Sequence, residues 1–296
     1  MMDWVGFEPT ASTLRRCQII RRNDVLEYIR IVELKGLCNK HIYEMKRFLN
    51  KYLDHVDYKI DKSKSIEYFS LLKDKYCTGS YRKQVYQILK FLRHFKVDWT
   101  DEIKLPPEPI YTPKYISLDM IESTIKYFRN HEYNLRFRAI IYIGIDSGLR
   151  AEELYQLTPE DIDIENQVVR INHNPNNGQS TKTKQSRVSF FTYNTKHILS
   201  EYINYFNNNN NFSKLFPQGW IERKFRNAPI KVKDLRKFFS QEWDRRGGPT
   251  SIKKILMGHS LKGDVDLMHY NYQSEEDLKR IYDKVMFKDI YKERNI

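Results

Sequence analysis

The sequence has few of the residues that mark several large protein classes. Its three cysteines, Cys17, Cys38 and Cys77, have spacings that fit neither a zinc site nor a disulfide framework. With 11 glycines, 10 prolines and 40% hydrophobic residues, the chain is neither fibrous nor disordered. The longest apolar run, 139–145, falls far short of the ~18 residues of a membrane span. The N-terminus has no apolar core typical of a secretory signal, so the cytoplasm is the expected compartment.

The chain also lacks a balance of charge. It carries 51 Lys and Arg against 38 Asp and Glu, which gives a formal net charge of +13. Residues 1–110 hold 21 basic and 15 acidic residues, and the remainder holds 30 and 23, so the excess is not confined to a tail. Such a chain is expected to bind a polyanion, with nucleic acid first. The length fits roughly two domains, each able to bury a core.

Helical periodicity dominates residues 17–104, which follow an irregular segment, 1–16. Apolar residues recur at helical spacing near 25–32, 42–52 and 85–92, and no proline interrupts the stretch. The pattern predicts a helical domain over 17–104. Basic residues lie between the apolar ones, where they either solvate the helix surfaces or contact DNA phosphates. The candidate DNA-binding residues are Lys40, Lys46, Arg47, Arg82, Lys83, Lys90 and Arg93.

Four prolines within residues 105–115 mark a boundary, because they block helix formation and favour an extended linker. Residues 116–296 then mix helices with one clear β signal. The segments 168–171 and 187–191 are predicted to form a hairpin with a long, polar, basic loop. The expected fold is mainly α (α+β): a helical domain, then a mixed, mostly helical domain with a small antiparallel hairpin or sheet.

In the second domain, the first candidate site residues follow a glycine turn. Arg150 follows Gly148 at a helix start, where backbone N–H groups and a guanidinium could both face an anion. Glu153, one turn further, could orient the arginine; alternatively, Arg150 is an exposed surface residue. The hairpin loop carries Lys182 and Lys184, which are either solvated or close over a phosphate.

Further basic and aromatic candidates follow the hairpin. Lys233 and Arg236 share one face of a predicted helix, because they are three residues apart. His259 follows a helix-ending glycine, a position where a lone histidine is more often a structural hydrogen bonder. Tyr270 and Tyr272 come next, in a chain with 21 tyrosines, so each alone is a weak candidate nucleophile.

Taken in order, these features resemble those of the tyrosine recombinase (phage integrase) family. The helical domain, the Pro-rich linker and the second domain also match the plan of that family, in which the first is a core-binding domain and the second is catalytic. The matching motifs are Ser147-Gly148-Leu149-Arg150-x-x-Glu153-Leu154, the hairpin lysine, Lys233-x-x-Arg236, Leu256-Met257-Gly258-His259-Ser260 and the following tyrosine.

The resemblance implies a reaction that needs neither metal nor cofactor. Tyr270 would attack a DNA phosphodiester to form a 3′-phosphotyrosyl link and release a 5′-hydroxyl. Arg150 and Arg236 would hold the non-bridging oxygens, and His259 would hydrogen-bond the phosphate. Lys182 would protonate the leaving oxygen. The implied partners are double-stranded attachment-site DNA and three further copies of the chain, in a homo-tetramer whose C-terminal segments, here 274–287, dock on neighbouring subunits.

Several assignments stay open. Alignment on the second strand favours Lys182 over Lys184, and the local pattern favours Tyr270 over Tyr272. Lys233 stands where most family members have histidine, which is similar to type IB topoisomerases. The alternatives to a recombinase are therefore a DNA-relaxing enzyme of that type and a catalytically decayed DNA-binding protein. The amphipathic C-terminal segment could equally pack on its own domain.

The first residues suggest a narrower identity. The codons for Gly6-Phe7-Glu8-Pro9 can contain GTTCGAACC, a sequence typical of the T-arm of tRNA genes. Integrases of archaeal spindle-shaped viruses and plasmids carry an attachment site that overlaps a tRNA gene inside their own gene. The hypothesis is that residues 1–16 are encoded by such a site, and that the chain inserts or excises a viral or plasmid genome there.

Overall fold

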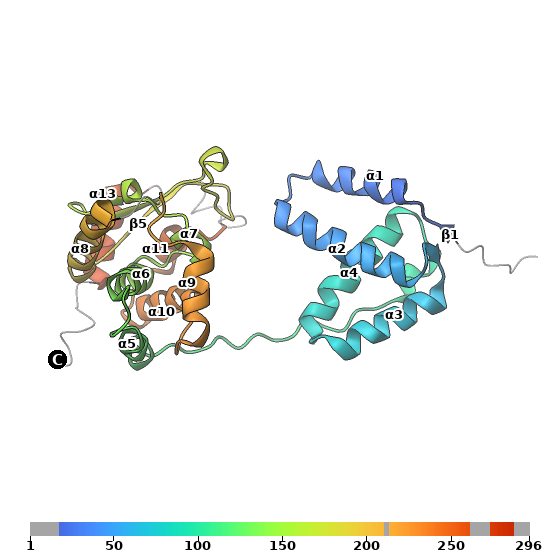
Figure 1. Cartoon of the computed structure of the whole chain (residues 1–296), viewed down its shortest axis with the longest axis horizontal. Helices are drawn as coiled ribbons and strands as arrows, with labels where there is room; N and C mark the ends of the chain where they lie inside the picture. Colours follow the sequence, from blue (N-terminus) through green and yellow to red (C-terminus); the bar gives the residue numbers. More distant parts are fainter. Residues whose placement is uncertain (1–17, 210–212, 261–272, 287–296) are drawn as a thin grey trace, which may run out of the picture. The chain divides into compact units, whose positions relative to one another are not determined.

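The computed structural model describes residues 18–209, 213–260 and 273–286. Its contacts divide the chain into Met1–Thr112, called unit 1 here, and Pro113–Ile296, called unit 2 (Figure 1). Each unit has its own hydrophobic core. Across the described ranges, every helix is too short or too polar to cross a membrane.

Unit 1 is a group of four helices whose apolar faces meet in one core. Asp61 caps the third helix by accepting a hydrogen bond from the backbone N–H of Lys64 at 3.0 Å. In the core, the hydroxyl oxygens of Tyr52 and Ser65 lie 2.8 Å apart, so each buried group has a partner. Two short strands pair antiparallel beside the helices. The elements are β1 (Gln18–Ile19), α1 (Arg22–Glu33), α2 (Asn39–His55), β2 (Lys59–Ile60), α3 (Lys62–Lys75), α4 (Thr78–His94) and the 3₁₀ helix η1 (Asp98–Glu102).

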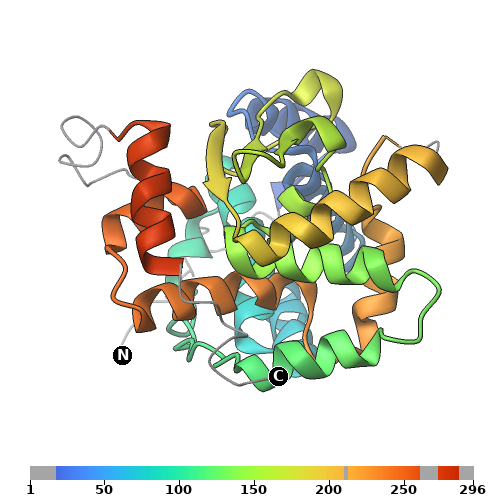
Figure 2. The same ribbon diagram turned by 90° about the vertical axis from the view of Figure 1, so that its left-hand side faces the viewer.

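Unit 2 is built around one buried helix, α6, which runs between α8 and α10 (Figures 1 and 2). The helices are α5 (Leu118–Tyr127), α6 (Asn134–Ser147), α7 (Ala151–Leu154), α8 (Tyr193–Asn209), α9 (Gln218–Lys224), α10 (Val232–Arg245), α11 (Thr250–Met257) and α13 (Glu275–Met286). The 3₁₀ helices are η2 (Pro159–Asp161), η3 (Pro175–Asn177) and η4 (Phe225–Asn227).

Two glycines set the position and the end of α6. A Cβ atom on Gly144 would lie 2.7 Å from a side-chain carbon of Leu235, so the close contact between α6 and α10 requires glycine there. Gly148 ends the helix with φ +63°, the left-handed conformation that favours glycine at a helix end. A Cβ there would also lie 2.3 Å from a ring carbon of Phe239. The chain therefore leaves α6 at a fixed point, just before Arg150.

A three-stranded antiparallel sheet covers part of this helical unit. Its order is β3 (Ile162–Asp163), β4 (Val168–Ile171) and β5 (Arg187–Phe190). In the register between β4 and β5, Ile171 lies opposite Arg187. The hairpin predicted from the sequence corresponds to β4 and β5, and β3 adds a short third strand. The prediction of a mainly helical fold with a small antiparallel sheet is confirmed.

The C-terminal helix α13 packs on its own unit, beside β5, α10 and α11. Leu278, Tyr282 and Met286 are buried in that contact. The hydroxyl of Tyr282 donates a hydrogen bond to the backbone carbonyl of Asp146 at 3.0 Å, close to the end of α6. The segment thus packs on its own domain in this single chain, and its docking on a neighbouring subunit stays a prediction.

Candidate active site

The site begins where Gly148 turns the chain out of α6. Arg150 takes an extended backbone conformation directly before α7, so its N–H points along the first turn of that short helix. This N–H donates to Glu153 Oε2 at 2.8 Å, and the Arg150 Nη1 donates to Glu153 Oε1 at 2.8 Å. The carboxylate thus holds both the backbone and the side chain of Arg150, the orienting role that the three-residue spacing predicted.

Glu153 has a second arginine partner that the sequence analysis missed. Arg187, at the start of β5, donates from Nη1 and Nη2 to the two carboxylate oxygens at 3.0 and 2.7 Å. Only 2% of the Glu153 side chain is exposed. Burial acts to raise the pKa of this carboxyl, but hydrogen bonds and charge from Arg187, followed by Arg150, hold it below its ordinary value. Glu153 is therefore ionised at neutral pH.

The C-terminal end of α11 supplies the second anchor of the site. Gly258 ends the helix with φ +62°, and its N–H and that of His259 donate to the carbonyls of Ile255 and Lys254 at 2.9 Å each. This leaves three consecutive carbonyls, of residues 256, 257 and 258, at the negative end of the helix dipole.

Each of these three carbonyls accepts a hydrogen bond from a different arginine. The Nε of Arg187 donates to Leu256 at 2.9 Å. The Nη1 of Arg236 donates to Met257 at 2.8 Å, and the Nη2 of Arg150 donates to Gly258 at 2.8 Å. Arg236 Nη1 also donates to the carbonyl of Gly148 at 2.8 Å. The end of α6, the start of α10 and the end of α11 meet at this point.

The cluster has more positive than negative charge. The pKa of Arg236 is lowered to about 9, first by burial and then by the charges of Arg150 and Arg187, while the charge of Glu153 acts in the opposite direction. Arg236 still carries its proton at neutral pH. Burial also lowers the pKa of His259, and the charges of Arg236 and Arg150 act in the same direction. An anion placed here would relieve the repulsion, so the geometry and the charge both suit a phosphate group.

The structure brings together three of the six predicted catalytic residues, Arg150, Arg236 and His259, with the supporting Glu153. Lys233 lies one turn before Arg236 on α10, and its side chain is exposed. Tyr270 and its alternate Tyr272 lie outside the described residues. In the described part of the chain, no group of three His, Cys, Asp or Glu side chains is placed to hold a metal ion.

The two hairpin lysines are exposed, in the part of the loop between the Asn174–Gln179 bridge and β5. Thr181 is buried beneath them, and its hydroxyl both accepts from the backbone N–H of Gln185 and donates to the carbonyl of the same residue. The Thr181 N–H donates to His173 Nδ1 at 3.1 Å. Lys182 and Lys184 therefore share one tight turn, and the lysine assignment stays a prediction.

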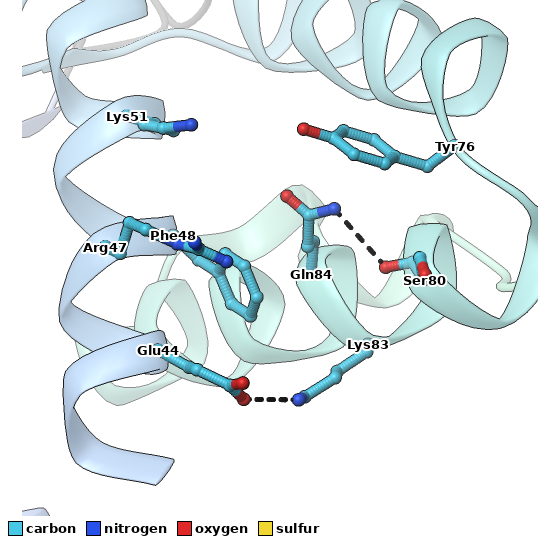
Figure 3. Close-up of a pocket in the computed structure, with 8 residues that line it drawn as sticks. All are labelled: Glu44, Arg47, Phe48, Lys51, Tyr76, Ser80, Lys83 and Gln84. Carbon is cyan, nitrogen blue, oxygen red and sulfur yellow. Dashed lines mark hydrogen bonds and ion pairs between the residues drawn. The ribbon is translucent and has the colours of Figure 1, made fainter. Parts of the chain in front are cut away.

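Two of the seven candidate DNA-binding residues of unit 1, Arg47 and Lys83, line a cavity of about 380 Å³ between α2 and α4 (Figure 3). Arg47, Lys51 and Lys83 supply positive charge, and Lys83 forms an ion pair with Glu44. Hydrogen-bonding side chains extend the wall on the α4 side. The lining residues are Glu44, Arg47, Phe48, Lys51, Tyr76, Ser80, Lys83 and Gln84.

Several of the other basic candidates have acidic partners on the surface. Lys46 pairs with Glu33 at 3.2 Å and Arg93 with Asp101 at 2.9 Å. Arg82 lies 3.4 Å from Glu108, while Lys40 is exposed and Lys90 is half-buried. Ion pairs at the surface contribute only about 0–1 kcal/mol, so a nucleic-acid phosphate could replace the carboxylates at little cost.

The chain belongs to the phage integrase family, whose model matches residues 114–270, more than half of the sequence. Among similar proteins, tyrosine recombinase XerA of Saccharolobus solfataricus is 34% identical over 119 residues, 40% of this chain and 37% of the relative. A probable integrase/recombinase of Acholeplasma phage L2 is 24% identical over 54% of this chain and 57% of its own length. The matched region thus spans less than two thirds of either relative.

Solved structures with the same fold include two further recombination proteins. A lambda integrase tetramer bound to a Holliday junction has a TM-score of 0.66 and 10% identity, and the likeness covers 85% of this chain and 79% of that one. The Tn1549 transposon integrase in complex with transposon right end DNA has a TM-score of 0.60 and 15% identity, over 87% of this chain and 97% of that one. At these identities the likeness concerns the fold.

Proposed function

We propose that this protein is a site-specific tyrosine recombinase that cuts and rejoins duplex DNA in the cytoplasm of its host cell. The observation that carries the proposal is the arginine cluster of unit 2, in which two half-buried guanidiniums are anchored on one helix end and on a buried carboxylate. Membership of the phage integrase family supports this reading. So do the solved structures of the same fold that were determined with DNA.

Arg150 and Arg236 are the proposed ligands of the scissile phosphate. Within the described residues, each guanidinium uses two of its five N–H donors on protein oxygens. Three donors on each side chain then remain for non-bridging phosphate oxygens. Because these donors are held before substrate arrives, they stabilise the pentacoordinate transition state without reorganisation. The neutral ring of His259 would donate a further hydrogen bond, and Lys233 would contact the same phosphate from α10.

The covalent step follows from this arrangement. The hydroxyl oxygen of Tyr270 would form a bond with phosphorus as the bond to the 5′-oxygen breaks, and the phenolic proton would pass to solvent. The leaving oxygen would take a proton from Lys182, and the product is a 3′-phosphotyrosine and a free 5′-hydroxyl. Attack by a 5′-hydroxyl of another strand reverses the reaction, so strands are exchanged without metal or external energy.

The first test traps the covalent intermediate. The probe is a pool of nicked duplexes of varied sequence, including the gene's own segment for residues 1–16, from which the released 5′-hydroxyl fragment diffuses away. We expect the wild type to form an adduct that survives detergent, and Tyr270→Phe to form none because its ring has no hydroxyl. Tyr272→Phe, the matched control, should retain the adduct.

Two results would contradict this. An adduct with Tyr270→Phe but not Tyr272→Phe would move the nucleophile to Tyr272. Absence of an adduct from the wild-type protein, with DNA binding intact, would favour a decayed DNA-binding protein instead.

A second prediction separates the two hairpin lysines. Lys182→Ala should slow adduct formation by about 10²- to 10⁴-fold, the usual contribution of a general acid. A substrate with sulfur in place of the 5′-bridging oxygen should restore the rate, because a thiolate leaves without a proton. Lys184→Ala is the matched control and should cleave both substrates at wild-type rates. Rescue of Lys184→Ala alone would assign the acid to Lys184.

We also propose contacts from unit 1 to the DNA backbone, through Lys40, Lys46, Arg47, Arg82, Lys83, Lys90 and Arg93. Neutralised phosphates release counterions, so affinity for duplex DNA should fall steeply as salt rises. On paired sites the chain is expected to act as a homo-tetramer, which the mass of the complex in solution would test.

The finer proposal is a viral or plasmid integrase of archaeal type that acts at a tRNA gene. It fails if codons 5–16 of the gene do not match the 3′ part of a tRNA gene.

Lys233 favours a second candidate, a DNA-relaxing enzyme of the type IB topoisomerase kind. Such an enzyme needs no partner site. Relaxation of a supercoiled circle lacking any attachment site would support this candidate, whereas strand exchange that needs two matched sites supports the recombinase.

A further inference from the structure

Arg187 is the arginine of the cluster that the covalent chemistry does not use. It opens β5, and the strand register sets it opposite Ile171 of β4. Its side chain is 9% exposed, against 21% for Arg150. A buried arginine on a strand is costly unless its charge and its N–H groups are matched.

The contacts of Arg187 match that requirement. Nη1 and Nη2 bind the two oxygens of Glu153 as a fork at 3.0 and 2.7 Å, and Nε binds the Leu256 carbonyl at 2.9 Å. Three of its five donors are thus committed to protein oxygens of two elements, α7 and α11, and these bonds tie β5 to both. Little of the side chain remains accessible to a phosphate.

Gly258 shows how closely this guanidinium is fitted. A Cβ atom at Gly258 would lie 2.7 Å from the Cζ and Nε of Arg187. The glycine before His259 therefore does two things: it ends α11 in the left-handed conformation, and it leaves the space that Arg187 fills. The Gly-His pair and Arg187 form one packing unit.

Arg187 also determines how much of Arg150 is taken up by Glu153. A fork between Glu153 and Arg187 occupies both carboxylate oxygens, so Arg150 gives only one side-chain N–H to Glu153. Without Arg187, the buried carboxylate would draw the Arg150 guanidinium into a two-pronged contact of its own. The donors that face the substrate would then turn toward the protein.

We propose that Arg187 is a positioning residue for DNA cleavage: by holding Glu153 and the end of α11, it keeps Arg150 and the Gly258–His259 turn in the geometry that binds the scissile phosphate. The inference rests on the proposed recombinase function. It assigns Arg187 no contact with the substrate.

The test compares single-turnover adduct formation by Arg187→Met, Arg187→Lys and the wild-type protein. Arg187→Met removes the charge and the fork, and a misplacement of about 1 Å in the phosphate ligands should slow cleavage about 100-fold. The dissociation constant for intact duplex should change less than about threefold, because Arg187 is not a phosphate contact. Arg187→Lys keeps one positive charge beside Glu153, so its cleavage rate should lie between those of Arg187→Met and the wild-type protein.

The pH profile distinguishes positioning from a general loss of structure. In Arg187→Met, burial acts on Glu153 with one less opposing charge, so the carboxyl pKa rises and the rate gains an acid limb that the wild type lacks at the same pH. Adding Glu153→Gln to Arg187→Met should remove that limb, and Arg187→Lys should not show it. A purely structural defect would lower the rate equally at every pH.

The matched control is Arg170, also on a strand of this sheet and paired with a carboxylate, Glu275, at 3.0 Å. Its side chain is 45% exposed and lies outside the cluster. Arg170→Met should cleave at the wild-type rate. If Arg187→Met, folded as judged by its thermal midpoint, cleaves like wild type with an unchanged pH profile, the inference is overturned while the recombinase proposal stands. If wild-type protein forms no adduct, the recombinase proposal falls, and the inference with it.

Discussion

Arg236→Lys is expected to lower the rate of DNA cleavage by about 10³-fold while leaving the affinity for intact duplex nearly unchanged. Arg236 Nη1 donates to two carbonyls, those of Gly148 and Met257, at 2.8 Å each, so the proposed phosphate contacts use the other N–H groups of the guanidinium. A lysine ammonium is a single point, so it can satisfy the carbonyls or the phosphate but not both. Loss of one preorganised donor to a transition-state oxygen typically costs about 10²- to 10³-fold in rate.

The measurement is the single-turnover rate on the nicked substrate, with affinity determined separately by titration of intact duplex. Arg245→Lys is the matched control, because Arg245 is in the last turn of the same helix, is 60% exposed and pairs with Glu242. It should cleave at the wild-type rate. An Arg236→Lys rate within a few-fold of wild type would mean that this guanidinium does not contact the transition state.

Glu153→Ala is expected to destabilise unit 2 by about 3–5 kcal/mol, because it leaves the positive charges of Arg150 and Arg187 without their buried partner. The carboxylate is 2% exposed and accepts four hydrogen bonds at 2.7–3.0 Å. Cleavage should be lost as well, because the backbone N–H and the guanidinium of Arg150 both lose the carboxylate that holds them. The substitution should therefore lower both the stability and the cleavage rate.

The free energy of unfolding can be measured in urea by tryptophan fluorescence. In a Trp4→Phe/Trp99→Phe background, the remaining reporters are Trp220 and Trp243, both in unit 2. Glu165→Ala is the control: Glu165 pairs with Lys196 at 2.9 Å but is 85% exposed, so its removal should cost about 1 kcal/mol or less. Equal losses for the two variants would refute the role of Glu153 as a buried anchor.

The same carboxylate gives this stability a defined dependence on pH. The pKa of Glu153 is lower in the folded protein than its ordinary value of 4.5. Its contribution is therefore complete above that ordinary value and is lost as the pH falls through the lowered one. The difference in unfolding free energy between wild type and Glu153→Gln should narrow over that acidic range and stay constant at higher pH.

Local signals in the sequence predicted some elements residue by residue. In α10 (Val232–Arg245) and α11 (Thr250–Met257), an apolar stripe and a terminal basic turn or glycine mark the helix and its end. The left-handed end of α6 is likewise marked in the sequence by its glycine, Gly148. By contrast, β1, β2 and β3 have two residues each, too few to show alternation, and α9 is a seven-residue helix without an N-terminal capping residue.

The site shows the same division between local and long-range information. Arg150 and Glu153 are three residues apart, so their pairing follows from helical geometry. Arg187 lies 34 residues from Glu153 and 69 from Leu256, and it meets both only through the strand register and the position of α11. Its one sequence signal is a charged residue at the head of a strand whose later members are buried, and that pattern fits a solvated strand end equally well.

The C-terminal end of α11 accepts a hydrogen bond from each of the three arginines, so it is an anchor that all three share. A shift of α11 along its axis by about 1 Å would lengthen three charge-assisted hydrogen bonds at once. It would therefore displace both proposed phosphate ligands, Arg150 and Arg236, together. Activity should then respond to the position of α11 as a switch does, on or off, rather than in graded steps.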